Sequence, residues 1–221
     1  MKECVIIMYK NVIKRVLDFL LALIGLVLSF PFQFIACLLI LIIDRMNPLF
    51  KQARVGKKEK VFYIYKMQTM KKDNNGVNQV TKLGKVLRAT SIDELPQLLN
   101  ILKGDMSFIG PRPWIKEYTK HFNKEQKRRH DVLPGISGLA QVNGRNDITI
   151  QDKIKSDLYY VDNVSFMLDL KIVFKTIAIV FKKTGASISE KGIEEEIEEL
   201  KKNNEVVIAE DLDPEDRVVN I

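Results

Sequence analysis

The longest apolar segment of the chain covers residues 16–43. Asp18, Ser29 and Gln33 are its only strongly polar side chains, and about 20 apolar residues are enough for a helix to cross the hydrocarbon layer of a membrane. A cleaved signal peptide does not fit, because the apolar region is too long and no cleavage site of small residues follows it. The pattern therefore predicts a helical membrane anchor near the N-terminus.

Pro31 lies near the middle of this segment and is expected to kink or break the helix, because proline removes a backbone hydrogen bond. Each half is then too short to cross the layer alone, and Ser29 can bond the backbone groups freed at the break. We favour a re-entrant helix–break–helix that enters and leaves by the same face, while a kinked single span stays open. Basic residues at both ends give the positive-inside rule no clear direction; they are Lys10, Lys14 and Arg15 before the segment and Arg45, Lys51, Arg54, Lys57 and Lys58 after it.

The remaining pattern predicts several short elements. Residues 61–67 are β-branched and aromatic, which is typical of a short strand, and residues 81–88, 150–163 and 166–183 are expected to be helices. The last of these has an apolar face between lysines, so it can lie on a membrane surface or pack in a core. That face consists of Ile172, Phe174, Ile177, Val180 and Phe181.

These elements predict an α+β fold that is mainly α with a small β element. Residues 1–48 are expected to form the N-terminal segment and re-entrant membrane anchor. Residues 49–184 are expected to form a compact cytoplasmic domain with surface amphipathic helices. Residues 185–221 are acidic and are expected to form a mobile tail, in which Ile193, Ile197 and Leu200 make one short amphipathic piece.

Charge is distributed unevenly along the 221 residues. The formal net charge is +7, but residues 185–221 hold 12 acidic and 4 basic side chains, so they carry −8 and residues 1–184 carry +15. A basic body favours phosphates or an anionic membrane surface as partners, although solubility alone would also explain it. A nucleic-acid binder is disfavoured because the apolar segment has no place in it. Cys4 and Cys37 are poor disulfide candidates, which fits a reducing compartment.

Two adjacent carboxylates, Asp93 and Glu94, stand at the centre of the chain. Ser91-x-x-Glu94 has the capping-box pattern, whereas Pro96 favours a later helix start. Either start places both acids at a helix N-terminus, where free N–H groups and the helix dipole keep carboxylates ionised. Taken alone, this pattern is explained by capping.

Two arginines follow in sequence contexts that folding does not require. Arg112 stands between two prolines, which limit where its guanidinium can point, and Arg145 ends the glycine-rich segment 134–145. Glycines let the backbone approach a ligand closely, and a guanidinium binds phosphate oxygens as a bidentate fork. No P-loop and no strand-borne G-x-G-x-x-G is present. We therefore predict a phosphate site on a different scaffold.

A series of motifs in one order resembles the bacterial monotopic phosphoglycosyl transferases, the sugar transferases that start glycan assembly on a polyprenyl phosphate. The resemblance covers residues 9–183 and is closest to the small single-domain members. The motifs are Lys14-Arg15-x-x-Asp18, Gln52-x-Arg54-x-Gly56, Lys66-x-x-Thr69-Met70, Asp93-Glu94-Leu95-Pro96-Gln97, Gly110-Pro111-Arg112-Pro113, Pro134-Gly135-x-x-Gly138, Gln141-Val142-Asn143-Gly144-Arg145 and Ser165…Asp169.

The resemblance implies a specific reaction. The family transfers a phosphosugar from a UDP-sugar to polyprenyl (undecaprenyl) phosphate and releases UMP. The resemblance assigns Asp93 as the nucleophile that forms a covalent phosphosugar intermediate, with Glu94 and Mg²⁺ assisting and the metal held at this pair. It assigns the phosphate and nucleotide site to Lys66, Arg88, Arg112 and Arg145. It also implies a re-entrant anchor in the inner (cytoplasmic) membrane, with the catalytic domain on the cytoplasmic face in contact with lipids.

Other assignments follow less directly. Asp157 and Asp169 are candidate polar groups supporting the site, or members of a solvated helix face. The sequence departs from the family where Phe30 separates Ser29 from Pro31, and where Gln68 replaces a commonly basic residue. The rival interpretation is a non-catalytic single-span membrane adaptor with a basic domain, which leaves the carboxylate pair without a function. The sugar, the glycan pathway and the oligomeric state, a homo-oligomer included, stay open.

Overall fold

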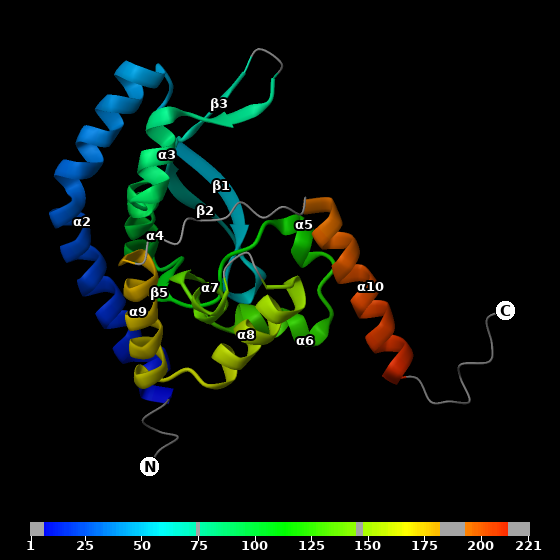
Figure 1. Cartoon of the computed structure of the whole chain (residues 1–221). Helices are drawn as coiled ribbons and strands as arrows, with labels where there is room; N and C mark the ends of the chain where they lie inside the picture. The colour runs from blue at the N-terminus through cyan, green and yellow to red at the C-terminus, as the bar shows by residue number, and fades with distance from the viewer. Residues whose placement is uncertain (1–6, 74–75, 145–147, 182–192, 212–221) are drawn as a thin grey trace.

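The computed structural model describes residues 7–73, 76–144, 148–181 and 193–211 (Figure 1). Helices surround three small two-stranded sheets, which confirms the predicted α+β class. Two of the sheets are antiparallel hairpins and the third is a single parallel pair. The strands place the loops that carry the candidate site, while the helices supply most of the core.

The anchor is one continuous helix that bends near its middle (Figure 1). The α-helix α2 (Lys14–Leu39) is extended by the π-helical turns η1 (Tyr9–Ile13) and η2 (Ile40–Asp44). These 36 residues are long and apolar enough to cross a membrane, with a length of about 54 Å at 1.5 Å per residue. Pro31 lies inside α2, so the helix does not break there, but Figure 1 shows that α2 is bent along its length, which fits the predicted alternative of a kink. Ser29 does bond a backbone group, because its hydroxyl donates to the Leu26 carbonyl at 3.4 Å.

Packing along one face explains why α2 continues past its proline. Ala22 packs in a core cluster with Leu98 and Ile101, and Ala36 and Ile40 pack in another with Met67 and Leu87. Both halves of the helix are thus held against the same domain. The opposite face exposes large apolar side chains over the same length, including Leu20, Leu21, Ile24, Val27, Leu28, Phe30, Ile35 and Ile42.

The first sheet pairs β1 (Leu49–Val55) with β2 (Val61–Met67) in antiparallel register. Strand β2 was predicted from the sequence, whereas β1 was not. The short turn η3 (Lys57–Glu59) joins the two strands. The second sheet pairs β3 (Met70–Lys72) with β4 (Asn78–Val80).

The third sheet pairs β5 (Ser107–Ile109) in parallel with β6 (Gly135–Ser137). It brings together the glycine-containing loops that follow the two strands. The helices between and after the strands are α3 (Lys82–Ala89), η4 (Ile92–Gln97), α4 (Leu98–Lys103), α5 (Lys116–Thr119), α6 (Lys124–Lys127), η5 (Arg128–Asp131), α7 (Leu139–Asn143), α8 (Ile150–Asp162), α9 (Phe166–Phe181) and α10 (Ile193–Asp211).

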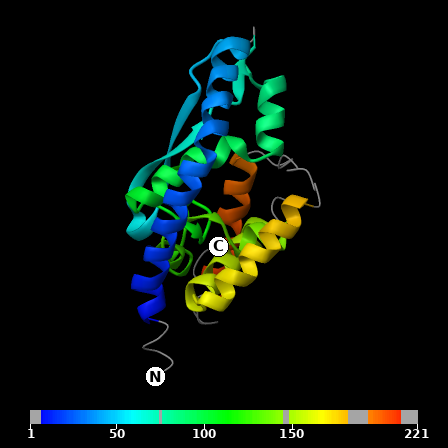
Figure 2. The same ribbon diagram turned by 90° about the vertical axis from the view of Figure 1, so that its left-hand side faces the viewer.

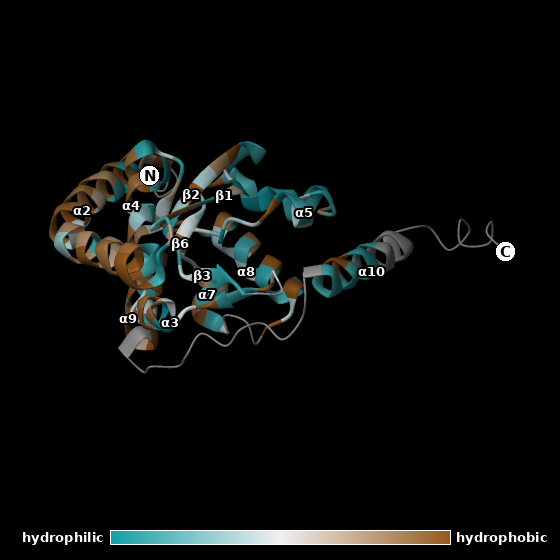
Figure 3. Cartoon of the chain, turned by 90° about the horizontal axis from the view of Figure 1, so that it is seen from above, coloured by the Kyte–Doolittle hydropathy of each residue, from teal (hydrophilic) through white to brown (hydrophobic). Residues whose placement is uncertain are grey.

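Helix α9 lies on the same side of the molecule as α2 (Figures 1 and 2). Ile172 is fully buried, so part of the predicted apolar face packs in the core, whereas Phe174 and Ile177 are exposed. Phe166 and Met167 at its start are exposed as well. Apolar residues of α2 and α9 thus share one side of the protein (Figure 3).

Helix α10 occupies part of residues 185–221, and the predicted amphipathic piece packs on the domain through Ile197 and Leu200. Leu200 is fully buried in a cluster with Tyr118, Phe122 and Ile154. The Glu196 carboxylate accepts hydrogen bonds from Tyr118 and from Lys153. One stripe of the acidic helix therefore provides apolar and polar contacts that hold it on the domain.

Leu200→Ala is expected to lower the free energy of unfolding by about 2–3 kcal/mol, because it removes a fully buried side chain and leaves a cavity. Urea denaturation in detergent measures the change. Lys201→Ala, an exposed change on the same helix, is the control and should stay within about 0.5 kcal/mol of the wild type. A Leu200→Ala value equal to that control would contradict the docking of α10.

Buried His130 is expected to make the stability of the fold depend on pH in the acidic range. Its ring is buried against Phe122, and within the described part of the chain neither ring nitrogen has a hydrogen-bond partner. Burial lowers its pKa from 6.5 to about 4; Arg129 and Lys127 add to the effect and Glu59 opposes it. The unfolded chain therefore binds the proton first, and the free energy of unfolding falls as pH drops from about 6.5 to about 4.

His130→Phe should remove the contribution of this proton. Between pH 6.5 and pH 4 the free energy of unfolding of the variant should then fall by about 1–3 kcal/mol less than that of the wild type. Urea denaturation of both proteins at several pH values measures the difference. His121→Phe is the histidine control and should keep the wild-type slope. Equal slopes for wild type and His130→Phe would contradict the assignment.

Candidate active site

The carboxylate pair lies in the first turn of the 3₁₀ helix η4. Asp93 is only 8% exposed. The predicted capping box does not form, because Ser91 has a left-handed backbone (φ 56°) and no capping side-chain bond. Pro96 lies inside η4 rather than at the start of α4. The prediction that both acids lie at a helix N-terminus is nevertheless confirmed.

Glu94 is paired with cations. Its Oε1 atom lies 2.6 Å from Lys66 Nζ on β2 and 4.0 Å from Arg112 Nη2. Burial acts to raise the pKa of Glu94, but Lys66 and Arg112 outweigh it and hold the pKa below its ordinary value. Glu94 is therefore an ionised carboxylate with a committed partner.

Asp93 differs from its neighbour, because its side chain has no ion pair or hydrogen-bonding side-chain partner in the part of the chain that the structure describes. Burial, followed by the negative charge of Glu94, raises the pKa of Asp93 to about 6, while Lys66 and Arg88 oppose the increase. Its carboxylate is thus poorly solvated and near cations. That is an environment suited to a nucleophile.

Arg88 approaches the site from the end of α3. Its Nε atom donates to Thr69 Oγ1 at 2.9 Å. Thr69 is itself held tightly, since a β-carbon added at Gly84 would lie 2.3 Å from the Thr69 carbonyl oxygen. The predicted cations Lys66, Arg88 and Arg112 therefore come from three separate segments and act on the same carboxylate pair.

The backbone of the Arg112 loop is fixed by two further arginines. Arg129 Nη2 donates to the Arg112 carbonyl at 2.7 Å, and Arg54 Nη1 donates to the Pro113 carbonyl at 3.4 Å. The Arg112 side chain itself is half exposed. Its guanidinium is thus accessible to a ligand while its backbone is held in place.

Arg129 was missed by the sequence analysis. Its side chain is almost fully buried, its Nη2 atom lies 2.6 Å from Asp157 Oδ2, and its guanidinium stacks 4.6 Å above the Trp114 ring. Asp157 thus supports the Arg112 loop through Arg129. The basic run that contains Arg129 gave no signal, because such runs are usually solvated.

Asp169 belongs to a different cluster. Its Oδ2 atom lies 2.5 Å from Lys14 Nζ and accepts a hydrogen bond from Tyr9 at 2.6 Å, while Tyr160 donates to Oδ1. These contacts tie α9 to the start of the anchor. Arg15 donates to the carbonyls of Ile101 and Leu102, so both predicted anchor cations bind the domain.

The glycine-rich segment serves packing. A β-carbon at Gly138 would lie 2.2 Å from the Gly110 carbonyl oxygen, and one at Gly135 would lie 2.2 Å from the Gly110 nitrogen. These glycines therefore let the two loops of the parallel pair meet, rather than giving a ligand access to the backbone as expected. Arg145 lies outside the described residues.

The described residues contain no group of three or more His, Cys, Asp or Glu side chains placed to hold a metal. Mg²⁺ is commonly held by one or two carboxylates, with substrate phosphates and waters completing its coordination. Asp93 and Glu94 match that smaller donor set, and the Asp93 carboxylate has no ion-pair partner within the described ranges.

The chain matches a family model described as bacterial sugar transferase over residues 9–183. It is 48% identical over 143 residues to the uncharacterized sugar transferase EpsL of Bacillus subtilis, covering 62% of this chain and 71% of that protein. It is 41% identical over 189 residues to the UDP-N-acetylgalactosamine-undecaprenyl-phosphate N-acetylgalactosaminephosphotransferase of Aeromonas hydrophila, covering 79% of this chain and 45% of the relative.

A relative of Caulobacter vibrioides is named UDP-glucose:undecaprenyl-phosphate glucose-1-phosphate transferase. It is 38% identical over 181 residues, which cover 74% of this chain and 68% of the relative. The chain thus spans less than half of the Aeromonas relative and about two thirds of the Caulobacter one.

Proposed function

The chain belongs to the bacterial sugar transferase family, and from this premise we propose that it transfers a phosphosugar from a UDP-sugar to undecaprenyl phosphate. The products are undecaprenyl-diphosphate-sugar and UMP. Relatives named for this reaction with N-acetylgalactosamine and with glucose support the reaction type. The sugar used by this chain is not fixed by them, because the two names differ in the sugar.

One observation carries the assignment of the nucleophile: Glu94 is paired with Lys66, whereas Asp93 has no such partner in the described chain. An Asp93 carboxylate oxygen attacks the β-phosphorus of the UDP-sugar, and the phosphoanhydride bond breaks to release UMP. A phosphate oxygen of undecaprenyl phosphate then attacks the same phosphorus. The bond from Asp93 to phosphorus breaks, and the carboxylate is regenerated.

Positively charged side chains reduce the repulsion between the Asp93 carboxylate and the substrate phosphates. Arg88 and Arg112 are placed to bind the diphosphate oxygens, and the fixed backbone beneath Arg112 limits the reorganisation required. Lys66 holds Glu94 in position beside them. Asp93 and Glu94 would hold Mg²⁺ together with the substrate diphosphate. The metal would supply positive charge against the negative charge that builds up during transfer.

Placement of the anchor favours a re-entrant, monotopic membrane protein over a single span. Residues from both halves of α2 pack against the same domain. A helix that crosses the bilayer would place part of that domain inside it. A bent helix, such as α2 in Figure 1, can enter and leave by one face and keep the domain in water. Ile92 and Leu95, on either side of the carboxylate pair, pack into the α2 clusters. The site would then stand at the membrane boundary, where a lipid acceptor arrives.

We assign the domain to the cytoplasmic face of the inner membrane, because UDP-sugars are made in the cytoplasm and the body of the chain is strongly basic. Labelling of single cysteines introduced near each terminus tests this topology. Both should react only after the cytoplasm is opened. Periplasmic labelling of either one would overturn the re-entrant arrangement.

Nucleotide release tests the reaction. The purified protein is incubated with a panel of UDP-sugars, with and without undecaprenyl phosphate and Mg²⁺, and UMP is separated from UDP. Release of UMP that depends on the lipid and the metal is expected with at least one sugar. Release of UDP instead would mean glycosyl transfer and would refute the proposal.

A further inference from the structure

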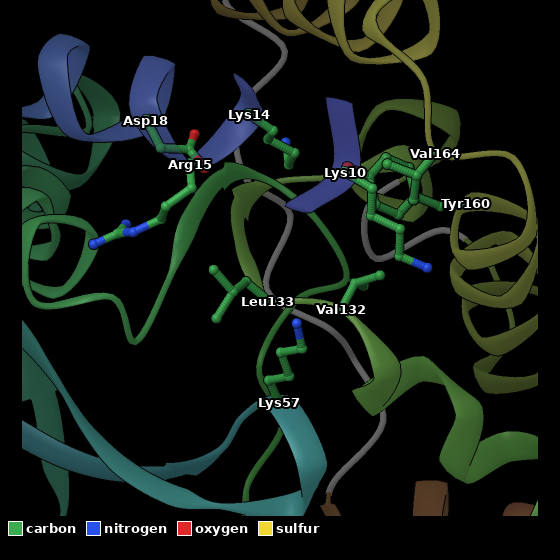
Figure 4. A pocket seen from close by; sticks show the side chains of 9 residues that line it. All are labelled: Lys10, Lys14, Arg15, Asp18, Lys57, Val132, Leu133, Tyr160 and Val164. Carbon is green, nitrogen blue, oxygen red and sulfur yellow. The ribbon is translucent and has the colours of Figure 1, made fainter. Parts of the chain in front are cut away.

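A small cavity of about 40 Å³ lies at the base of the anchor (Figure 4). It is enclosed by side chains from η1, α2, η3 and α8 and from the short segments at residues 132–133 and 164. None of its lining residues belongs to the site around Asp93. Its volume has room for a group of a few heavy atoms.

Four basic side chains line this cavity, and two of them already have partners. Lys14 is paired with Asp169, and Arg15 donates to two backbone carbonyls. Lys10 and Lys57 are half-buried and have no ion-pair or hydrogen-bond partner within the described ranges. Two free ammonium groups at one cavity favour an anion, since a partly desolvated charge is stabilised by an opposite one.

The position of Lys57 is built by an unusual turn. The two residues after it, Lys58 and Glu59, both have left-handed backbones, with φ values of 55° and 58°. Such a conformation is strained for residues other than glycine. Figure 4 shows that the turn directs Lys57 toward Val132 and Leu133, while Lys10 descends from η1 on the other side.

A third group in the cavity has an unused hydrogen-bonding atom. Asp18 is only 5% exposed, and its Oδ1 atom accepts from the Phe108 N–H at 3.1 Å. Its Oδ2 atom is buried and has no hydrogen-bond partner among the residues that the structure describes. A buried acceptor without a donor is costly. A ligand that completes the cavity therefore needs a hydrogen-bond donor as well as a negative charge.

Exposed apolar residues lie close in sequence to lining residues of the cavity and indicate where its ligand comes from. Ile7 and Met8 precede η1, and Phe166 and Met167 follow the lining residue Val164. Lysines beside apolar side chains that enter a membrane extend their charges to the phosphate level of the lipid. The cavity thus lies at the depth of the lipid headgroups in the membrane placement proposed above.

We propose that this cavity binds the headgroup of an anionic phospholipid, with the phosphodiester between Lys10 and Lys57 and a headgroup hydroxyl donating to Asp18. Phosphatidylglycerol carries both groups. The bound lipid would fix the N-terminal end of the anchor at the membrane surface. This proposal rests on the membrane placement of the proposed function and is independent of the transfer chemistry.

Native mass spectrometry of the full chain in a non-ionic detergent tests the site with phosphatidylglycerol and phosphatidylcholine. The wild type is expected to retain one phosphatidylglycerol with roughly tenfold preference over phosphatidylcholine. Lys10→Gln/Lys57→Gln should lose this preference. The matched control Lys116→Gln/Lys120→Gln removes two exposed lysines at α5, on the side opposite α2, and should keep it (Figure 1).

Three results would overturn the proposal: equal retention of the two lipids by the wild type, an unchanged preference in Lys10→Gln/Lys57→Gln, or an equal loss in the control variant. Competition with inorganic phosphate distinguishes the sources of the anion. Displacement of phosphatidylglycerol by an equal concentration of phosphate would mean that the site takes the soluble ion. Lipid binding is measured without a sugar donor, so this test remains valid even if the protein proves not to be a phosphosugar transferase.

Discussion

Asp93→Asn is expected to abolish phosphosugar transfer, lowering kcat by at least about a thousandfold. The neutral amide has nearly the same shape as the carboxylate but cannot attack phosphorus. Burial raises the pKa of Asp93, so the charge at this position is a cost to the fold, and the variant should be at least as stable as the wild type. Release of UMP and urea denaturation measure the two effects.

Glu94→Gln is the matched control for this prediction. It removes the neighbouring charge and the partner of Lys66, so transfer should slow, but the nucleophile remains. The account predicts that the Gln variant keeps activity above that of the Asn variant. An Asp93→Asn protein with more than a tenth of wild-type turnover would exclude a covalent role for this carboxylate.

Arg129→Met is expected to lower the free energy of unfolding by about 3–5 kcal/mol. The change leaves Asp157 buried without its partner and removes the donor to the Arg112 carbonyl. Burial already raises the pKa of Asp157, and Arg129 opposes that increase, so the carboxyl should become protonated in the variant. Denaturation by urea and release of UMP measure stability and activity in parallel.

The double variant Arg129→Met/Asp157→Leu separates two roles of Arg129: stabilising the fold and positioning the Arg112 loop. Replacing both charges with apolar groups of similar volume should restore most of the stability, because no unpaired buried charge remains. Activity should stay low, since the Arg112 carbonyl still lacks its donor. Recovery of full activity together with stability would show that Arg129 serves the fold alone.

The carboxylate pair could be predicted because its signal is local. Two adjacent acids before an apolar run define a helix N-terminus whatever surrounds them, and the structure places them there. The sequence pattern alone could not predict that Glu94 is ion-paired while Asp93, among the residues that the structure describes, is not. This difference depends on Lys66, which lies on a strand 28 residues earlier and reaches Glu94 only once the chain is folded.

Features that depend on distant contacts were missed or mistaken. Pro31 was expected to kink or break the anchor; the helix is bent but continuous, and both of its halves pack on one domain. Strand β1 is exposed along most of its length and is defined by its pairing with β2, so its sequence lacks the usual alternation. Arg129 is buried by Trp114 and Asp157, which lie on either side of it in sequence.

Helix α10 is a further feature that depends on contacts distant in sequence, here in an acidic segment. Its charges predicted a mobile tail, while the few apolar positions that dock it form a stripe too short to outweigh them in a sequence pattern. The buried contacts of Leu200 and Asn204 become evident only with the surface of α5 and α6 in place.

The intact mass of the protein, measured after incubation with a UDP-sugar and Mg²⁺ but without a lipid acceptor, tests the central claim most directly. The account predicts an increase equal to one sugar phosphate on Asp93, lost when undecaprenyl phosphate is added and absent in Asp93→Asn. An unmodified mass in a preparation that releases UMP when the acceptor is present, or an adduct that persists in Asp93→Asn, would contradict it.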